Sequence, residues 1–462
     1  MKTSPISSTE FSKFKEYYIK ECKECGICFK NCFAYTNTEY PIHKNLKSLF
    51  KSNLDKKNVK RIKKFLNSCL YCKSCENSCK NELDLSVRLA AIKFELFKID
   101  RKYTWLPHNI PSIFGKFVNG RRLAYLLRNL NNYLIPWKNR EKFDKYRVPK
   151  TRDVIFFTGC GIQMLEDQYY TILEILIKLD INFGLIEGSF DKPVCCGAEL
   201  IEYGQFEHGI YLLNNLFDEI TKFNTKKVMV YCATCYYGLK KLAPQFIEDF
   251  DLEIIYAADY IAELLRKEEN KELLNTLSVK SNIITIHDSC HLAQSGDTSS
   301  IRNLLSILPK ISMSEMKHNK QNSICDLYCI IRELDNPLKL ILKKDIMPII
   351  DEAVESNADV LCSLCPGCHA FLTIFGDGLS SSLGLTKKRI LVKNWVSILG
   401  EYLGIRKRDM LNYRLSHFIT IPFKDSLLWY LLQILKAFVR GYIGLKEPRT
   451  IIFGFFLNKL NN

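Results

Sequence analysis

The 462-residue sequence lacks the signals of several common enzyme and membrane classes. No GxGxxG follows a predicted strand and no GxxxxGK[ST] is present, which argues against a flavin, nicotinamide or nucleotide site in this chain. The N-terminal stretch has no apolar core of a secretory signal, and its Glu10, Glu16 and Glu21 do not suit a transit peptide. No apolar run reaches the ~20 residues that a membrane-spanning helix needs.

Positive charge, in contrast, is abundant and confined to two segments. Residues 101–150 hold twelve Lys/Arg against two Asp/Glu, and residues 401–462 hold ten against four, which accounts for the whole net charge of +16. Residues 121–137 and 426–444 have the apolar spacing of amphipathic helices with basic edges. These two segments could bind an anionic membrane surface, pack on the protein's own core, or form a solvated face. We expect no nucleic-acid partner, because neither segment contains a recognised binding module.

The nineteen cysteines are far more than ordinary usage, and either disulfides or metal ligation could explain them. Disulfide scaffolds are short and secreted, whereas this chain is long and shows no secretory signal. We therefore interpret the cysteines as metal thiolates in a reducing, cytoplasmic compartment.

Two cysteine quartets near the N-terminus share the spacing C-x2-C-x2-C-x3-C, and the second follows the first by 47 residues without a gap. In this spacing, three cysteines of a loop bind one [4Fe–4S] cluster and the fourth binds the other cluster. Zinc sites also use C-x2-C pairs, but they do not require a third cysteine at the same spacing, as in C-x2-C-x2-C. The predicted ligands of cluster one are Cys22, Cys25, Cys28 and Cys79. The predicted ligands of cluster two are Cys69, Cys72, Cys75 and Cys32.

From position 150 onward, short apolar runs each end at a cysteine. The runs begin at Val154, Val228, Ile283 and Ala358, and helical stretches such as 163–179 separate them. Alternating strands and helices predict α/β units with sites at the carboxyl ends of the strands. We expect two such units, at about 151–278 and 279–400.

The first unit contains five cysteines in a rarer pattern: a single cysteine, then a Cys-Cys-Gly sequence, then a C-x2-C pair. Gly197, which follows the adjacent cysteines, permits a backbone conformation that other residues resist. These five cysteines are Cys160, Cys195, Cys196, Cys232 and Cys235.

Two quartets followed by this pattern resemble the iron–sulfur oxidoreductase superfamily with cysteine-rich (CCG) domains. Its members include the catalytic subunits of heterodisulfide reductases and the iron–sulfur subunits of glycolate oxidase and anaerobic glycerol-3-phosphate dehydrogenase. The resemblance covers residues 20–400. It implies a third, noncubane [4Fe–4S] cluster on the five cysteines of the first unit, where a disulfide is cleaved in the heterodisulfide reductases.

The second unit departs from the family pattern, because no adjacent cysteines follow Cys290. Two alignments of the second unit with the first are possible. If equivalent residues are 130 positions apart, Asp326 takes the place of Cys196. If they are 133 apart, the alignment that we favour for the closing C-x2-C pair, Tyr328 takes the place of Cys195. The site could hold a conventional cluster, use Asp326 as a ligand, hold zinc or be empty. His287 and His291 could ligate metal or relay protons, but a structural role in a strand-end turn is favoured. The candidate cysteines are Cys290, Cys325, Cys329, Cys362, Cys365 and Cys368.

The predicted fold class is therefore α+β and multidomain. It comprises a helical ferredoxin-like domain (1–100), a basic linker (101–150), two repeated α/β cysteine-rich domains (151–278 and 279–400) and a basic tail (401–462). The resemblance implies an oxidoreductase component that passes electrons from the 4Fe-4S clusters to the first cysteine-rich domain, for disulfide reduction or quinone-linked transfer. The alternative is a non-catalytic conduit for a flavin dehydrogenase. The expected partners are a flavoprotein or a membrane cytochrome or quinone-linked protein, with the chain peripheral on the inner face of the cell membrane. A third interpretation is a zinc-stabilised binding protein.

Overall fold

The computed structural model describes most of the region from residue 141 to residue 405 and a small part of the N-terminal region. The described ranges are 20–30, 74–81, 141–159, 161–187, 194–202, 206–275, 281–323, 347–373 and 390–405, with the single positions Val59, Ile62, Leu83, Leu89, Ile92 and Leu96. Most of the expected ferredoxin-like domain and both basic amphipathic segments lie outside these ranges.

The first α/β unit contains a four-stranded parallel sheet in the order β2-β1-β3-β4. Its strands are β1 (Val154–Phe157), β2 (Phe183–Ile186), β3 (Lys227–Val230) and β4 (Glu253–Tyr256). Its helices are η3 (Gly161–Met164), α11 (Glu166–Lys178), α12 (Ala198–Glu202), α13 (Phe206–Thr221), α14 (Ala233–Tyr237), η4 (Gly238–Leu242), α15 (Ala243–Phe246), α16 (Ala257–Leu265) and α17 (Glu268–Asn275).

The second unit repeats this architecture with a parallel sheet in the order β6-β5-β7-β8. Its strands are β5 (Asn282–His287), β6 (Ile311–Met313), β7 (Val360–Ser363) and β8 (Leu391–Asn394). Its helices are α18 (Cys290–Gln294), α19 (Ser300–Ile307), η5 (Lys320–Asn322), α22 (Met347–Glu355), α23 (Pro366–Phe371) and α25 (Trp395–Tyr402). The predicted pair of α/β units is thus confirmed.

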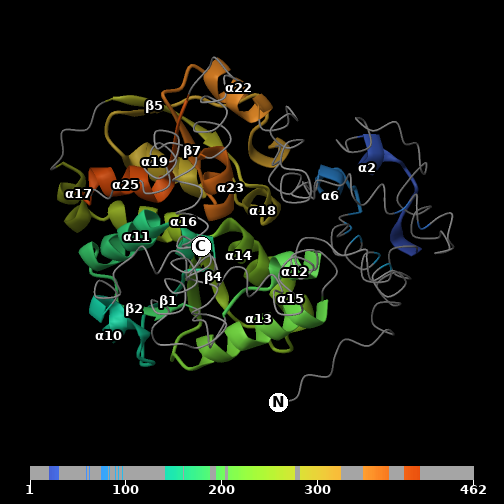
Figure 1. Cartoon of the computed structure of the whole chain (residues 1–462), viewed down its shortest axis with the longest axis horizontal. Coiled ribbons are helices and arrows are strands. Elements are labelled where there is room, and N and C mark those ends of the chain that lie inside the picture. Colours follow the sequence, from blue (N-terminus) through green and yellow to red (C-terminus); the bar gives the residue numbers. More distant parts are fainter. Residues whose placement is uncertain are drawn as a thin grey trace, which may run out of the picture.

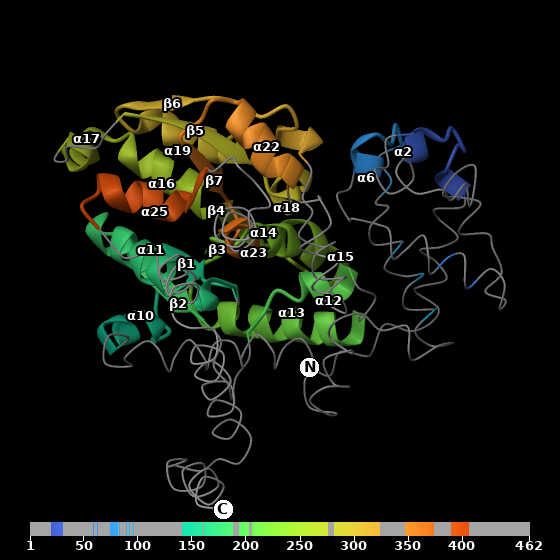
Figure 2. The ribbon, with the colours of Figure 1, turned by 45° about the horizontal axis from the view of Figure 1, so that its top comes forward.

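Buried apolar strands and amphipathic helices explain why both units fold this way. All four residues of β1 and of β2 are buried, as expected for strands of a parallel sheet covered on both faces. Helices α11 and α16 of the first unit and α25 and α19 of the second lie between the two sheets (Figure 2). The cores of the two units therefore form one continuous hydrophobic cluster.

The contacts between the units are reciprocal. Helix α11, which follows β1, contacts α25, which follows β8, while α16, which follows β4, contacts α19, which follows β5. At Gly400 the approach is close enough that a Cβ would lie 2.6 Å from the methyl carbon of Thr171. Such a pairing of equivalent elements is what a two-fold relation between two similar units produces.

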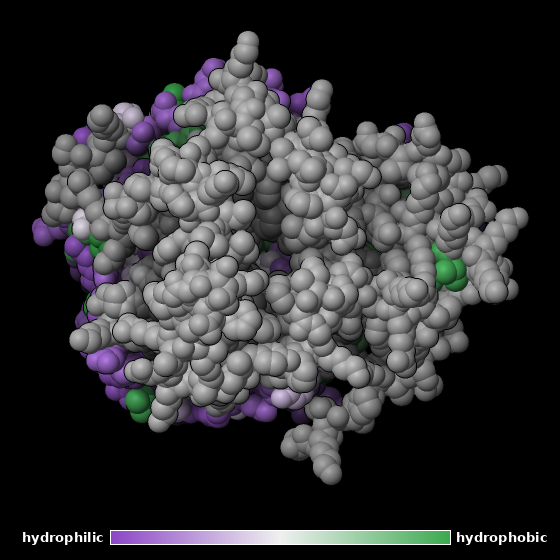
Figure 3. Space-filling view, viewed as in Figure 1, coloured by the Kyte–Doolittle hydropathy of each residue, from purple (hydrophilic) through white to green (hydrophobic). Residues whose placement is uncertain are grey.

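The remaining described segments lie around these units. Helices α2 (Ile27–Lys30) and α6 (Ser74–Asn77) lie beside them, and η2 (Glu141–Phe143) and α10 (Asp144–Arg147) precede β1 (Figure 1). The described surface visible in Figure 3 is mostly hydrophilic. Among the described helices, none combines the length and the apolar character required to cross a bilayer.

Candidate iron–sulfur sites

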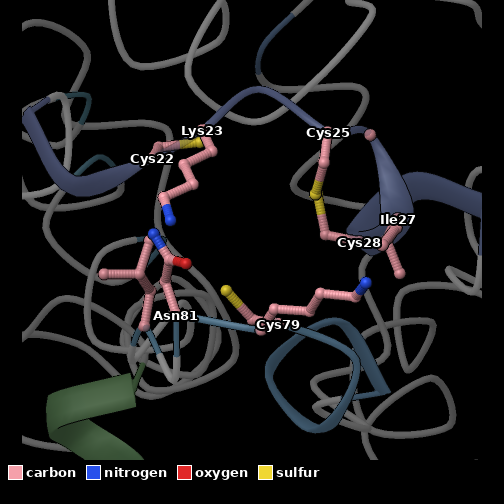
Figure 4. A pocket seen from close by; sticks show the side chains of 10 residues that line it. Cys22, Lys23, Cys25, Ile27, Cys28, Cys79 and Asn81 are labelled. Atoms are coloured by element: carbon pink, nitrogen blue, oxygen red, sulfur yellow. The ribbon is translucent and has the colours of Figure 1, made fainter.

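The first N-terminal site is a cavity of about 130 Å³ lined by cysteines from both quartets. Cys22, Cys25 and Cys28 come from the first quartet, and Cys79 comes from the end of the second (Figure 4). The structure thus brings together the four residues predicted for cluster one. Of those predicted for cluster two, only Cys75 is among the described residues; Cys32, Cys69 and Cys72 lie outside them.

Backbone geometry explains how the first quartet curls around this cavity. Glu24 and Gly26 have φ angles of 55° and 73°, in the left-handed region that reverses the chain between successive cysteines. Asn81 donates a hydrogen bond from Nδ2 to the backbone oxygen of Glu21 at 2.6 Å, which ties the two quartets together. Four thiols around a cavity fit a cubane cluster, because thiolates are the ligands that iron–sulfur clusters require.

In the first α/β unit the cysteines lie at the carboxyl end of the sheet. Cys232 is the N-cap of α14, directly after β3, and Cys235 lies in the first turn of that helix. Cys195 and Cys196 precede α12, and the φ of Gly197 is 69°. Strands β1 and β3 are neighbours, but the chain continues from β1 to β2 at one edge of the sheet and from β3 to β4 at the other. The crevice between β1 and β3 is therefore the topological switch point, where open α/β sheets bind ligands. Cys160 lies outside the described residues.

Glycines surround these sulfur atoms and leave room for them. A Cβ at Gly159 would lie 2.9 Å from Sγ of Cys235, and a Cβ at Gly238 would lie 3.4 Å from Sγ of Cys196. Cys196, Cys232 and Cys235 are themselves buried. A buried thiol set cradled by glycines fits a metal–sulfur group, and the donors are the soft ligands that iron–sulfur clusters use.

Thiols of the two units are neighbours. The thiol of Cys195, followed by burial, raises the pKa of Cys196, and the thiols of Cys196 and Cys232 raise the pKa of Cys235. Sγ of Cys232 lies 3.9 Å from Sγ of Cys365 in the second unit. The neighbouring thiols of Cys232 and then Cys368 hold the pKa of the Cys365 thiol well below its usual range.

The second unit places its cysteines in two different environments. Cys290 begins α18, and Cys365 is the N-cap of α23, the position that Cys232 has at α14. Cys362, in contrast, lies inside β7, and its thiol donates to the backbone oxygen of Ser363 at 3.9 Å. Because both residues are helix N-caps, Cys365 of the second unit is equivalent to Cys232 of the first, 133 positions earlier in the sequence. Cys325, Asp326, Tyr328 and Cys329 lie outside the described residues.

A buried polar cluster that the sequence did not indicate links the two units beside the thiols. Nε2 of His291 lies 3.0 Å from Oε2 of Glu202, and its Nδ1 lies 3.2 Å from Oγ1 of Thr234. All three side chains are buried. The sequence favours a structural role for His291, but no spacing pattern marks Glu202 as its partner, since the two are 89 positions apart.

Glu199 is a second acidic residue near the thiols that the sequence did not single out. Its side chain is exposed, and the protein packed close to it, followed by the charge of Cys195, raises its pKa to about 7.

Comparisons with known proteins agree with this layout. Residues 18–83 match the 4Fe-4S dicluster domain family. Residues 154–240 and again 284–373 match the cysteine-rich domain family. The resemblance to an iron–sulfur superfamily predicted from the cysteine spacing is therefore confirmed.

Several curated proteins are similar over most of the chain. The D subunit of the dihydromethanophenazine:CoB–CoM heterodisulfide reductase of Methanosarcina mazei is 22% identical over 88% of this chain and 99% of its own length. An uncharacterized iron-sulfur protein of Methanococcus maripaludis is 24% identical over 87% of this chain and 78% of its own length. EtfAB:quinone oxidoreductase of Syntrophomonas wolfei is 24% identical over 68% of this chain and 43% of its own length.

Proposed function

Because the chain carries a 4Fe-4S dicluster domain and two cysteine-rich domains and is distantly homologous to the heterodisulfide reductase D subunits and EtfAB:quinone oxidoreductase, we propose that it is an iron–sulfur electron-transfer subunit of a redox complex. The observation that carries the proposal is the cavity lined by Cys22, Cys25, Cys28 and Cys79, which brings the two quartets to one site. Iron–sulfur clusters take up and release single electrons, at potentials from about −700 to +450 mV.

In this proposal the two quartets hold two cubane clusters reciprocally. The first α/β unit holds a third cluster, of the noncubane kind that the resemblance implies, on its five cysteines. There the chain itself contributes the burial of Cys196, Cys232 and Cys235, which keeps water from their sulfur atoms, and the glycines beside Cys196 and Cys235. The ligands of the third cluster are Cys160, Cys195, Cys196, Cys232 and Cys235.

The proposed reaction is reduction of a disulfide or transfer linked to a quinone. Reduction of a disulfide to two thiols takes two electrons and two protons, so a partner must supply the electrons. Since the chain shows no flavin or nicotinamide motif, that partner is a flavoprotein dehydrogenase or a membrane cytochrome or quinone-linked protein. The chain is placed peripherally on the inner face of the cell membrane; recovery of the full-length protein in the soluble fraction at low salt would contradict this placement.

The test is anaerobic purification followed by iron and sulfide analysis and EPR of the reduced protein. We expect at least eight iron atoms per chain and signals from reducible cubane clusters. A colourless preparation with zinc, or fewer than eight irons, would sink the proposal.

Serine variants then test how the quartets share their clusters. Cys22→Ser and Cys79→Ser, from different quartets, should remove the same EPR signal, because both side chains line one cavity. Cys75→Ser is the matched control and should remove the other signal. If Cys79→Ser and Cys75→Ser instead remove the same signal, each quartet binds its own cluster and the reciprocal assignment is wrong.

A second candidate function is a conduit that joins a flavin dehydrogenase to the membrane and has no substrate of its own. It is favoured by the second unit, which has no adjacent cysteines after Cys290. A disulfide-reduction assay with a chemical electron donor separates the two. Activity of the isolated chain that disappears in Cys195→Ser and Cys196→Ser supports catalysis. Activity that arises only after a flavoprotein is added supports the conduit.

A further inference from the structure

The thiols of the two units meet at the junction between them, although the pattern of the sequence assigns them to separate sites. Sγ of Cys232 and Sγ of Cys365 are 3.9 Å apart, and both residues are buried. A disulfide would require about 2.05 Å, so the two sulfurs are separate thiols in contact. Cys235 and Cys368 lie in the first turns of α14 and α23, the helices that begin after Cys232 and Cys365.

The reciprocal packing of the units explains why these residues converge. Helix α14, which begins after Cys232, contacts α18 of the second unit, while α23, which begins after Cys365, contacts η3 of the first. At the second contact, a Cβ on Gly161 would lie 3.2 Å from Cβ of Pro366. The carboxyl ends of both sheets thus face a common junction. Helices α14, α18 and α23 lie near one another there (Figures 1 and 2).

Buried hydrogen bonds across the junction fix the two cysteine-bearing turns relative to each other. Tyr256, at the end of β4, donates from its hydroxyl to the backbone oxygen of Leu364 at 2.7 Å, one residue before Cys365. On the other side, His291 of the second unit is held between Glu202 and Thr234 of the first. Because these bonds are buried and cross the junction, the contact of Cys232 with Cys365 belongs to a built site.

Among the residues that the structure describes, no three Cys, His, Asp or Glu side chains are placed to hold a single metal ion. The ligands of an iron–sulfur cluster bind different iron atoms, so two thiols in contact can serve one cluster without meeting at a single ion.

We propose that Cys232, Cys235 and Cys365 ligate one iron–sulfur centre that the two units share, with Cys365 as a ligand supplied across the junction. The inference rests on the proposed function, because it takes an iron–sulfur centre in the first unit as given. It differs from the pattern implied by the resemblance, in which each cysteine-rich unit binds its own cluster. It also gives the second unit a role that does not require a second cysteine-rich cluster.

The test compares Cys365→Ser with Cys232→Ser in the full-length protein purified anaerobically. We expect both variants to lose the same EPR signal and the same amount of iron. The double variant should lose no more than either single variant, since residues that act in one centre are not additive. Cys362→Ser is the matched control: this buried cysteine lies inside β7, where its thiol contacts the backbone oxygen of Ser363, and its variant should keep both the signal and the iron.

Retention of the Cys232-dependent signal in Cys365→Ser, or losses that add in the double variant, would overturn the shared centre. The signals of the N-terminal clusters serve as an internal reference. If the signals of the N-terminal clusters are absent from the unmodified protein, the proposed function is wrong. If those signals are present but Cys365→Ser has no effect, only the proposal of a shared centre is wrong.

A substitution that keeps the ligand guards against a variant that does not fold. Replacing the sulfur of Cys365 by ⁷⁷Se, as Cys365→Sec, should broaden the Cys232-dependent EPR signal by hyperfine coupling, because only an atom bound to the cluster couples strongly. The same replacement at Cys362 should leave that signal unchanged. An unbroadened signal from folded Cys365→Sec protein would contradict the proposal.

Discussion

Replacing Gly197 with alanine is expected to lower the free energy of unfolding by about 4 kcal/mol and to disorganise the adjacent cysteine pair. Gly197 has a φ of 69°, and a Cβ built on it would lie 2.1 Å from the backbone oxygen of Gly209 in α13. A left-handed non-glycine residue costs about 1–3 kcal/mol. Overpacking adds about 1–3 kcal/mol, and here the obstacle is backbone, which cannot rotate away as a side chain could.

The matched control for this variant is Gly296→Ala. Gly296 also has a positive φ, 84°, but no atom lies within 4 Å of the Cβ that alanine would add. Gly296→Ala should therefore lower the free energy of unfolding only by the cost of the left-handed backbone conformation, about 1 kcal/mol. Thermal or denaturant unfolding of the two variants, together with their iron content, measures the difference. Equal losses for Gly197→Ala and Gly296→Ala would show that the approach to Gly209 is not what requires glycine in the Cys-Cys-Gly sequence.

The strands that end at cysteines could be predicted from the sequence, because short buried apolar runs carry their own signal. The run at Val154 is β1, which begins where predicted, while β3, predicted from Val228, begins one residue earlier and β7, predicted from Ala358, begins two residues later. The predicted helical stretch 163–179 corresponds to α11 and the turn before it. The edge strands β2, β4, β6 and β8 end at no cysteine, so the cysteine pattern gave no indication of them.

The junction between the units could not be predicted, because its contacts join residues that are far apart in the sequence. Cys232 and Cys365 are 133 positions apart, and Glu202 and His291 are 89 apart. Periodicity reports which face of one element is buried, but not which element of the other unit covers it. The reciprocal pairing of α11 with α25 and of α16 with α19 decides that, and it arises from packing.

Cys362 shows a related limit of reasoning from spacing. The sequence C-x2-C-x2-C allows either its first or its last pair to correspond to Cys232 and Cys235. Only the backbone separates these alternatives, since Cys365 caps a helix whereas Cys362 lies within a fully buried strand. A free cysteine in such a strand behaves as a small hydrophobic residue, and burial accordingly raises the pKa of the Cys362 thiol.

Arg302→Ala is expected to destabilise the second unit by about 3–5 kcal/mol, because it leaves a buried carboxylate without its cation. Nη1 and Nη2 of Arg302 contact the two carboxylate oxygens of Asp288 at 2.8 and 2.9 Å, and Asp288 is 2% exposed. The same carboxylate accepts from the backbone N–H of Lys320 at 2.7 Å. Asp288 therefore ties the turn that leads into Cys290 to the segment that leads toward residue 325.

Arg302→Lys should restore only part of this loss, since an ammonium cannot make the two parallel hydrogen bonds of a guanidinium. Lys142→Ala serves as the control, because it removes an ion pair with Glu174 that is far more exposed; it should cost less than about 1 kcal/mol. Denaturant unfolding at neutral pH measures all three variants. A loss in Arg302→Ala no larger than that in Lys142→Ala would contradict the role given to Asp288.

The pH dependence of the same variant gives a second, independent measure of this network. Hydrogen bonds from Arg302 lower the pKa of Glu315 below its ordinary value of 4.5. A carboxyl whose pKa is lower in the folded state stabilises the fold above its unfolded pKa, and this contribution is lost as the pH falls through the folded pKa. The gap in unfolding free energy between the unmodified protein and Arg302→Ala should therefore be constant above about pH 5 and should narrow below about pH 4.5. A gap that stays constant down to about pH 3 would show that the carboxyl of Glu315 gains nothing from Arg302.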